Sequence, residues 1–187
     1  MARKGKNYFK ALYDVAKVIN ASLKPDEVLA QIVKCVAAAM QVKACSLRVL
    51  DSKRERLLMG GSWGLSQGYI RKGPVLVKES GLDQNALRGK TVWLENAQSD
   101  KGFQYRGKAR AEGIKSLLVV PLMLGKKAIG VLRVYSAEIR KFDDEEVRFL
   151  QAAANLSAIA LENARMHQVL RTDFDLLVAH EYRVDDN

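Results

Sequence analysis

Cysteine and histidine are scarce in this sequence, which has two of each among its 187 residues. The spacing of Cys35 and Cys45 fits neither a disulfide framework nor a metal site, and both are expected to be small buried apolar residues. His167 and His180 are thirteen residues apart, so they do not share a helix face at the spacing of metal ligands. A catalytic nucleophile needs an activating base beside it. The sequence therefore predicts a protein that is not an enzyme and that carries no metal or cofactor.

Long apolar runs are also missing. No stretch is long and apolar enough to span a bilayer, and residues 1–10 lack the apolar segment of a signal peptide. With so few cysteines, the chain is expected in the reducing cytoplasm, without a membrane partner.

The charge is uneven along the chain. The formal net charge is +10, yet the residues from Asp143 onward contain four basic residues against ten acidic ones. Such asymmetry can mark a nucleic-acid or membrane surface. The basic residues are dispersed, however, and no helix-turn-helix or zinc-finger pattern accompanies them. We therefore expect no nucleic-acid partner and interpret the charge as a basic globular surface facing an acidic helix.

Glycine is absent after Gly130, and twelve of the thirteen glycines lie from Gly60 to Gly130. The two ends are therefore predicted to be helical, and the middle to consist of strands and loops. Long helices are expected at 7–21, from Pro25 onward and after Asp143. The expected shorter elements are strands at 44–51, 55–63, 75–77 and 91–94 and helices at 65–71, 81–88 and 108–112.

The stretch from Ser116 to Leu150 carries the clearest pattern. Its sequence is SLLVVPLMLGKKAIGVLRVYSAEIRKFDDEEVRFL. Two nearly continuous apolar runs flank Gly125, which predicts a central hairpin closed by a type II′ turn. Pro121 interrupts the first run and predicts a bulge or an unpaired position there. A capping box from Asp143 to Glu146 then marks the start of a long helix.

This stretch resembles the C-terminal half of a GAF domain. The resemblance lies in the motifs VPL at 120–122, IGVL at 129–132 and AIALENA at 158–164. It extends more weakly back to about Asn7, where residues 11–40 look like the family's opening helix pair. The resemblance implies an α+β fold, a GAF/PAS-like central antiparallel sheet of five or six strands. The N- and C-terminal helices would pack on one face of this sheet, and short helices and loops on the other. It also implies a single-domain, stand-alone module of bacterial signal transduction.

The long C-terminal helix has two possible courses and one possible partner. Nothing from Asp143 to about Tyr182 stops a helix, so it either projects from the domain or breaks near Arg171. A stripe with alternating spacings of three and four favours helix–helix packing: Val147, Leu150, Ala154, Ser157, Leu161 and Ala164. In the family such helices commonly pack with those of a second copy, which implies a parallel or antiparallel homodimer; otherwise the stripe only covers its own sheet. The expected regions are a disordered basic N-terminus at 1–6, a GAF domain at 7–165 and a C-terminal helical extension at 166–187.

In this fold a small molecule binds between the sheet and the irregular middle segments. The matching positions combine aromatic and basic side chains: Trp63, Tyr69, Trp93, Phe103, Tyr105, Arg106, Arg110 and Lys115. Aromatic walls with a few polar groups are typical of small-molecule sites, and arginine can grip a carboxylate or phosphate. We expect an anionic or planar ligand beneath residues 95–113, unless the aromatic residues are core and the basic ones a solvated surface.

Several functions known in the family lack their residues here. Residues 60–130 contain no cysteine or histidine, which disfavours cysteine-based methionine sulfoxide reduction, phytochrome-like bilin attachment and haem binding. The phosphodiesterase-type cyclic-nucleotide motif lacks its Asn and Lys. The resemblance therefore implies a ligand-sensing homodimer that acts on a separate signalling protein such as a kinase or a nucleotide cyclase. A ligand-free dimerisation or scaffold module is the alternative, and a small redox enzyme of the methionine sulfoxide reductase type is a weaker one.

Overall fold

Six antiparallel strands form one central sheet in the structure, a computed structural model that describes residues 7–22, 24–100 and 103–184. Their order across the sheet is β3-β2-β1-β6-β5-β4. The strands are β1 (Ala44–Leu50), β2 (Arg56–Trp63), β3 (Val75–Leu76), β4 (Val92–Leu94), β5 (Ser116–Leu124) and β6 (Lys127–Ser136). The α+β class and the antiparallel sheet expected from the sequence are confirmed.

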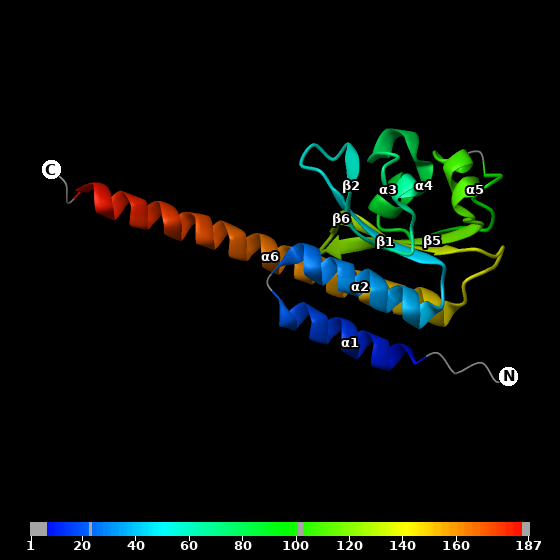
Figure 1. Ribbon diagram of the computed structural model, residues 1–187, viewed down its shortest axis with the longest axis horizontal. Coiled ribbons are helices and arrows are strands. Elements are labelled where there is room, and N and C mark those ends of the chain that lie inside the picture. The colour runs from blue at the N-terminus through cyan, green and yellow to red at the C-terminus, as the bar shows by residue number, and fades with distance from the viewer. Residues whose placement is uncertain (1–6, 23, 101–102, 185–187) are drawn as a thin grey trace.

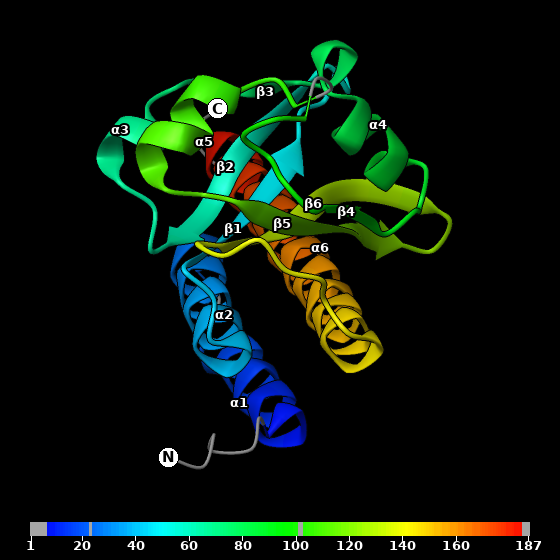
Figure 2. The ribbon, with the colours of Figure 1, turned by 90° about the vertical axis from the view of Figure 1, so that its right-hand side faces the viewer.

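Long helices lie on one side of the sheet and short helices on the other (Figure 1 and Figure 2). The long helices are α1 (Tyr8–Ala21), α2 (Pro25–Met40) and α6 (Asp144–Val184). The short ones are α3 (Gln67–Ile70), α4 (Gly81–Leu87) and α5 (Arg106–Glu112), and a 3₁₀ turn, η1 (Val77–Glu79), lies between β3 and α4. We call the two sides the long-helix face and the short-helix face.

Both faces of the central strands are buried, which explains their nearly continuous apolar sequences. In β1, Leu47 lies in the core of the long-helix face and Ala44 in the core of the short-helix face. In β5, Leu118 lies in the core of the long-helix face and Leu117 in the core of the short-helix face. Since successive side chains of a strand point to opposite faces, each central strand supplies two separate cores.

The hairpin of β5 and β6 closes through Gly125 and Lys126, because Leu124 pairs directly with Lys127. Gly125 has a φ of 58°, the positive value that the first central residue of a type II′ turn needs. The two-residue loop predicted from the sequence is confirmed.

Pro121 was expected at a bulge or at an unpaired position, and among the described residues the structure shows no bulge there and no partner for it on the β4 side. It pairs in register with Val131, and the irregularity in β5 falls between Leu122 and Met123 instead. On the other side of β5, the pairing with β4 ends at Val119. An edge of β5 without a neighbouring strand tolerates the missing N–H of proline.

α6 begins with the predicted capping box and runs on without a break. Asp143 Oδ1 accepts a hydrogen bond from the Glu146 N–H at 2.8 Å, and Glu146 Oε2 accepts one from the Asp143 N–H at 3.1 Å. The helix has 41 residues and continues through Arg171. At 1.5 Å per residue it is roughly 60 Å long, and it projects beyond the sheet (Figure 1). Within the described part of the chain, no helix is both long and apolar enough to cross a membrane.

The stripe on α6 that was expected to pair with a second helix packs against the protein's own sheet. Leu150, Ala154 and Ser157 have no exposed surface. Val147 and Leu161 pack against the same long-helix core. A helix that covers a sheet also needs apolar residues at spacings of three and four. Of the two interpretations of this stripe, packing on the protein's own sheet is the one that these buried residues follow.

Candidate functional site

The eight residues expected to form a ligand pocket do not all lie together. Tyr69 and Phe103 are buried, and Tyr105 is partly buried, in the core of the short-helix face. Trp63 at the end of β2 and Trp93 in β4 are 40% and 37% exposed. The three basic residues are exposed: Arg106, Arg110 and Lys115. The structure thus gathers three of the five aromatic side chains and leaves the other residues at the surface.

Two buried arginines, absent from the expected set, lie on the same face of the sheet. Arg48 in β1 and Arg133 in β6 are each 1% exposed. Ser46 pairs with Arg133 across the two strands, so Arg48 and Arg133 are diagonal neighbours. The sequence holds one signal for them, because the tripeptide Leu-Arg-Val occurs at 47–49 and again at 132–134. A basic residue inside two strands that are covered on both faces indicates a buried charge.

Asp83 in α4 neutralises Arg133. Its carboxylate accepts a hydrogen bond from the Arg133 guanidinium, and both side chains are almost completely buried. Ser80, the N-cap residue of α4, donates from Oγ to Asp83 Oδ2 at 2.5 Å. Burial lowers the pKa of Arg133, but the Asp83 carboxylate outweighs it and the net shift is upward. Arg133 is therefore a charged group held in a fixed position.

Arg48 has no comparable acidic partner. Its Nη1 donates to the backbone oxygen of Leu57 at 3.2 Å. Its Nε and Nη2 have no hydrogen-bond partner among the residues that the structure describes. Burial, with the nearby charge of Arg133, lowers the pKa of Arg48. Because burying an ion costs several kcal/mol unless partners compensate it, an incoming acceptor would stabilise Arg48.

Tyrosine and lysine side chains complete this region. Tyr69 in α3 and Tyr135 in β6 make an edge-to-face contact with ring centres 6.1 Å apart, and the Tyr135 hydroxyl is 2.8 Å from Ser46 Oγ. Lys72 Nζ lies 3.8 Å from the ring centre of Tyr69 and 4.6 Å from that of Tyr105. Neither Lys72 Nζ nor the Tyr69 hydroxyl has a hydrogen-bond partner within the described ranges.

These side chains form one buried polar group, which we call the arginine–tyrosine cluster: Arg48, Tyr69, Lys72, Asp83, Arg133 and Tyr135. Burial, together with the two arginines, lowers the pKa of Lys72 to about 6. Burial also raises the pKa of Tyr69. At neutral pH the cluster therefore holds two guanidinium cations, one carboxylate and a largely neutral lysine. It is suited to binding negative charge.

The cysteines lie away from this cluster. Cys45 is buried in the long-helix core, and Cys35 in α2 packs against the same core. Burial raises the pKa of both thiols. In the part of the chain that the structure describes, no group of three or more His, Cys, Asp or Glu side chains could hold a metal ion.

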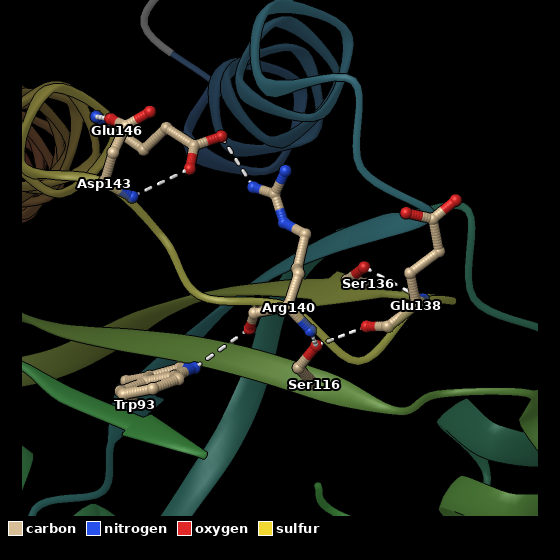
Figure 3. A network of polar contacts seen from close by, with 7 residues as sticks. All are labelled: Trp93, Ser116, Ser136, Glu138, Arg140, Asp143 and Glu146. Carbon is tan, nitrogen blue, oxygen red and sulfur yellow. Dashed lines mark hydrogen bonds and ion pairs between the residues drawn. The ribbon is translucent and has the colours of Figure 1, made fainter. Parts of the chain in front are cut away.

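A second polar network joins the sheet to the start of α6 (Figure 3). We call its connecting segment, residues 137–143, the joint. The backbone oxygen of Arg140 accepts from the Trp93 indole at 3.3 Å, and the Arg140 N–H donates to Ser116 Oγ at 3.1 Å. The Arg140 guanidinium forms an ion pair with Glu146 at 2.6 Å. The joint therefore ties β4 and β5 to the first turn of α6.

An apolar groove of about 190 Å³ lies on the long-helix face, between α2 and α6. Val28, Leu29 and Leu161 line it, and its lining contains no charged side chain. Beyond the groove, from Arg165 to Leu176, every residue of α6 is exposed. The groove has the chemistry of a helix-packing surface, whereas the arginine–tyrosine cluster lies on the opposite face of the sheet.

These features define a class of protein, an α+β domain with a polar cluster buried between its sheet and a layer of short helices. The chain belongs to the GAF domain family, whose model matches residues 22–162. The resemblance carried by the central hairpin and the helix after it is thereby confirmed.

Two relatives are named as a regulatory protein and as a sensor. The Nif-specific regulatory protein of Azorhizobium caulinodans is 23% identical over 182 residues, which cover 93% of this chain and 29% of that protein. The methyl sulfide methyltransferase-associated sensor of Methanosarcina acetivorans is 28% identical over 151 residues, which cover 78% of this chain and 15% of that protein. This chain thus spans less than a third of either relative.

Solved structures show the same fold. The GAF domain of an Acinetobacter phosphoenolpyruvate-protein phosphotransferase superposes with a TM-score of 0.73 at 27% identity, covering 87% of this chain and 96% of that domain. The free methionine-R-sulfoxide reductase of Neisseria meningitidis superposes with a TM-score of 0.73 at 18% identity, covering 89% and 95%. The likeness to the reductase shows a shared fold alone.

Proposed function

We propose that this chain is a sensory module of a signalling pathway and that it binds a small molecule between its sheet and its short helices. The observation that carries the proposal is the arginine–tyrosine cluster. Within the described chain, buried donors of Arg48, Tyr69 and Lys72 lack partners. A core built only for stability satisfies nearly all of its buried polar groups, whereas a ligand site holds donors ready. The regulatory and sensory names of the relatives support the same function.

In this proposal the module acts as a homodimer through α1 and α6. On α6, five apolar side chains beyond the sheet are each more than half exposed: Met166, Val169, Leu170, Phe174 and Leu176. Phe9 and Tyr13 are likewise exposed on α1. Most helical stability in proteins comes from packing of an apolar face. A second copy would supply a matching apolar face for each helix.

The output of such a dimer would pass through the joint into α6. A ligand shifts an equilibrium only when it binds two conformations with different affinity, so the two arrangements must differ at the joint or along α6. A separate signalling protein, such as a kinase or a nucleotide cyclase, would receive the change. Nucleotide- or metabolite-dependent activity of a partner that binds α6 would test this step.

Thermal unfolding with a library of nucleotides, organic acids and aromatic metabolites tests ligand binding. A ligand at 100 times its Kd stabilises the native state by about 2.7 kcal/mol, which corresponds to a Tm increase of about 5–10 °C for a domain of this size. If no compound raises the Tm while the chain still dimerises, the result favours the alternative function, a ligand-free dimerisation or scaffold module. A redox enzyme is disfavoured by the position of both cysteines in or against the long-helix core.

A further inference from the structure

The arginine–tyrosine cluster has more hydrogen-bond donors than acceptors. Within this cluster, the buried atoms that have no partner among the residues described are Arg48 Nε and Nη2, Arg133 Nε, Tyr69 Oη and Lys72 Nζ. The carboxylate of Asp83 already accepts from Arg133 and Ser80. The group that would complete these contacts is therefore an acceptor from outside the cluster.

Charge points to the same kind of group. Arginine keeps its proton in proteins, so Arg48 and Arg133 place two positive charges beside the single carboxylate of Asp83. The charge of Arg133 acts unfavourably on Arg48, where it adds to the effect of burial in lowering the pKa. A negatively charged group between them would replace this repulsion with attraction.

Arg48 is the side chain that can grip such a group. Arg133 is held by Asp83, and only its Nε remains open. Arg48 uses Nη1 for Leu57 and keeps Nε and Nη2. These two neighbouring N–H groups point in the same direction, which matches two oxygens of a carboxylate or a phosphate.

We propose that the cluster binds a small organic anion through its carboxylate or phosphate, with Arg48 Nε and Nη2 as the paired contact and Arg133 Nε as a second one. This inference rests on the proposed sensing function and deepens it by naming the chemical class of the ligand. Tyr69 of the cluster, with Phe103 and Tyr105 of the same core, supplies aromatic surface, which suits a short or flat carbon skeleton.

Isothermal titration calorimetry of the full chain tests the charge requirement. Succinate, benzoate and inorganic phosphate serve as anions, and succinamide and benzamide are the neutral matches of the first two. At least one anion is expected to bind, with its neutral match at least about tenfold weaker, because the amide cannot make charge-assisted hydrogen bonds. Equal binding of anion and amide overturns the inference.

Two arginine variants test the contact itself. Arg48→Gln is expected to weaken anion binding on the order of 100-fold, the loss typical when one partner of a buried charge pair is removed. Arg56→Gln removes an exposed arginine of the neighbouring strand β2, and less than about a threefold change is expected because exposed ion pairs contribute little. Unchanged anion affinity in Arg48→Gln overturns the assignment of Arg48.

The remaining outcomes separate this inference from the proposed function. If neutral metabolites raise the Tm and no anion binds, the anion class is wrong and ligand sensing stands. If neither anions nor neutral metabolites bind, both the anion class and the proposed ligand sensing are wrong. If Arg48→Gln does not fold, the Arg48 Nε–H signal in the NMR spectrum of the unmodified chain decides: it must shift on addition of the anion that binds, and a stationary signal overturns the contact.

Discussion

At the scale of single residues, Lys72 gives the arginine–tyrosine cluster a pH dependence. Burial, with Arg48 and Arg133 nearby, lowers the pKa of Lys72 from 10.5 to about 6, while Asp83 and Glu112 offset part of the shift. In the unfolded chain the lysine keeps its ordinary pKa. Between these two values the unfolded state holds more protons than the folded state. The stability linked to Lys72 therefore rises as the pH rises through this window.

Replacing Lys72 by methionine removes this titration. Relative to Lys72→Met, the unmodified chain is expected to gain free energy of unfolding from pH 6 to pH 10, by at most about 1.4 kcal/mol per pH unit. Urea unfolding at several pH values measures the difference. Lys78→Met serves as the control, because Lys78 is exposed on η1. Parallel pH curves for Lys72→Met and the unmodified chain would contradict the low pKa of Lys72.

The candidate site shows which residues a sequence can reveal. Tyr69 and Phe103 stand out as aromatic residues in an otherwise polar, irregular segment; the structure places Tyr69 in the arginine–tyrosine cluster and Phe103 in the same core. Trp93 has the same sequence signal but lies in the edge strand β4, partly exposed. Arg48 and Arg133 were hidden inside apolar strands. The buried ion pair of Arg133 with Asp83 forms only in the tertiary structure, which brings α4 to β6.

At the scale of elements, the joint between β6 and α6 depends on Glu146. Its carboxylate accepts from the Asp143 N–H at 3.1 Å and pairs with Arg140 at 2.6 Å, and its side chain is 3% exposed. Glu146→Ala is expected to lower the free energy of unfolding by about 2 kcal/mol, because it removes a capping interaction and leaves Arg140 without this ion pair. Urea unfolding monitored by circular dichroism measures the loss.

The neighbouring Glu145 provides a matched control for that prediction. It lies in the same first turn of α6 but is exposed. Glu145→Ala is expected to change the free energy of unfolding by less than about 0.5 kcal/mol, as surface substitutions usually do. Equal losses in the two variants would show that only the general negative charge at the helix start matters, and not the contacts of Glu146.

Elements defined by local chemistry were predictable, and contacts between elements were not. Gly125 and the capping box of Asp143 act within a few residues, so their patterns can be read directly from the sequence. The α6 stripe around Ala154 has a spacing that suits packing on a sheet as well as on a second helix. In the structure it packs on the sheet of its own domain. Pro121 likewise depends on where β4 ends, which the sequence of β5 does not contain.

At the scale of the whole molecule, the sheet separates the arginine–tyrosine cluster from the exposed surface of the long helices. The arginine–tyrosine cluster lies on the short-helix face, and α6 lies on the long-helix face and projects beyond it (Figure 1). The joint contacts the sheet on the long-helix side, because Trp93 in β4 and Ser116 in β5, which bond to Arg140 (Figure 3), lie on the same face of the sheet as Leu118. A displacement of these strands by a ligand would therefore reach the first turn of α6.

The projecting part of α6 makes the proposed dimer testable without disturbing the sheet. Leu170 and Phe174 are one helical turn apart and 66% and 65% exposed. Their joint replacement by glutamate is expected to change the mass in light scattering from twice to once the chain mass of 20.8 kDa, because charged side chains would be buried between two apolar faces. Gln168→Glu with Thr172→Glu adds the same charge on another side of the helix and is expected to leave the dimer intact.

Two outcomes would contradict this prediction. A dimer that survives Leu170→Glu with Phe174→Glu would place the contact on α1 or elsewhere, and a single-chain mass for the unmodified protein at micromolar concentration would remove the dimer from the proposed function. Since the two double variants carry equal charge at equal spacing, a difference between them assigns the contact to the apolar side of α6.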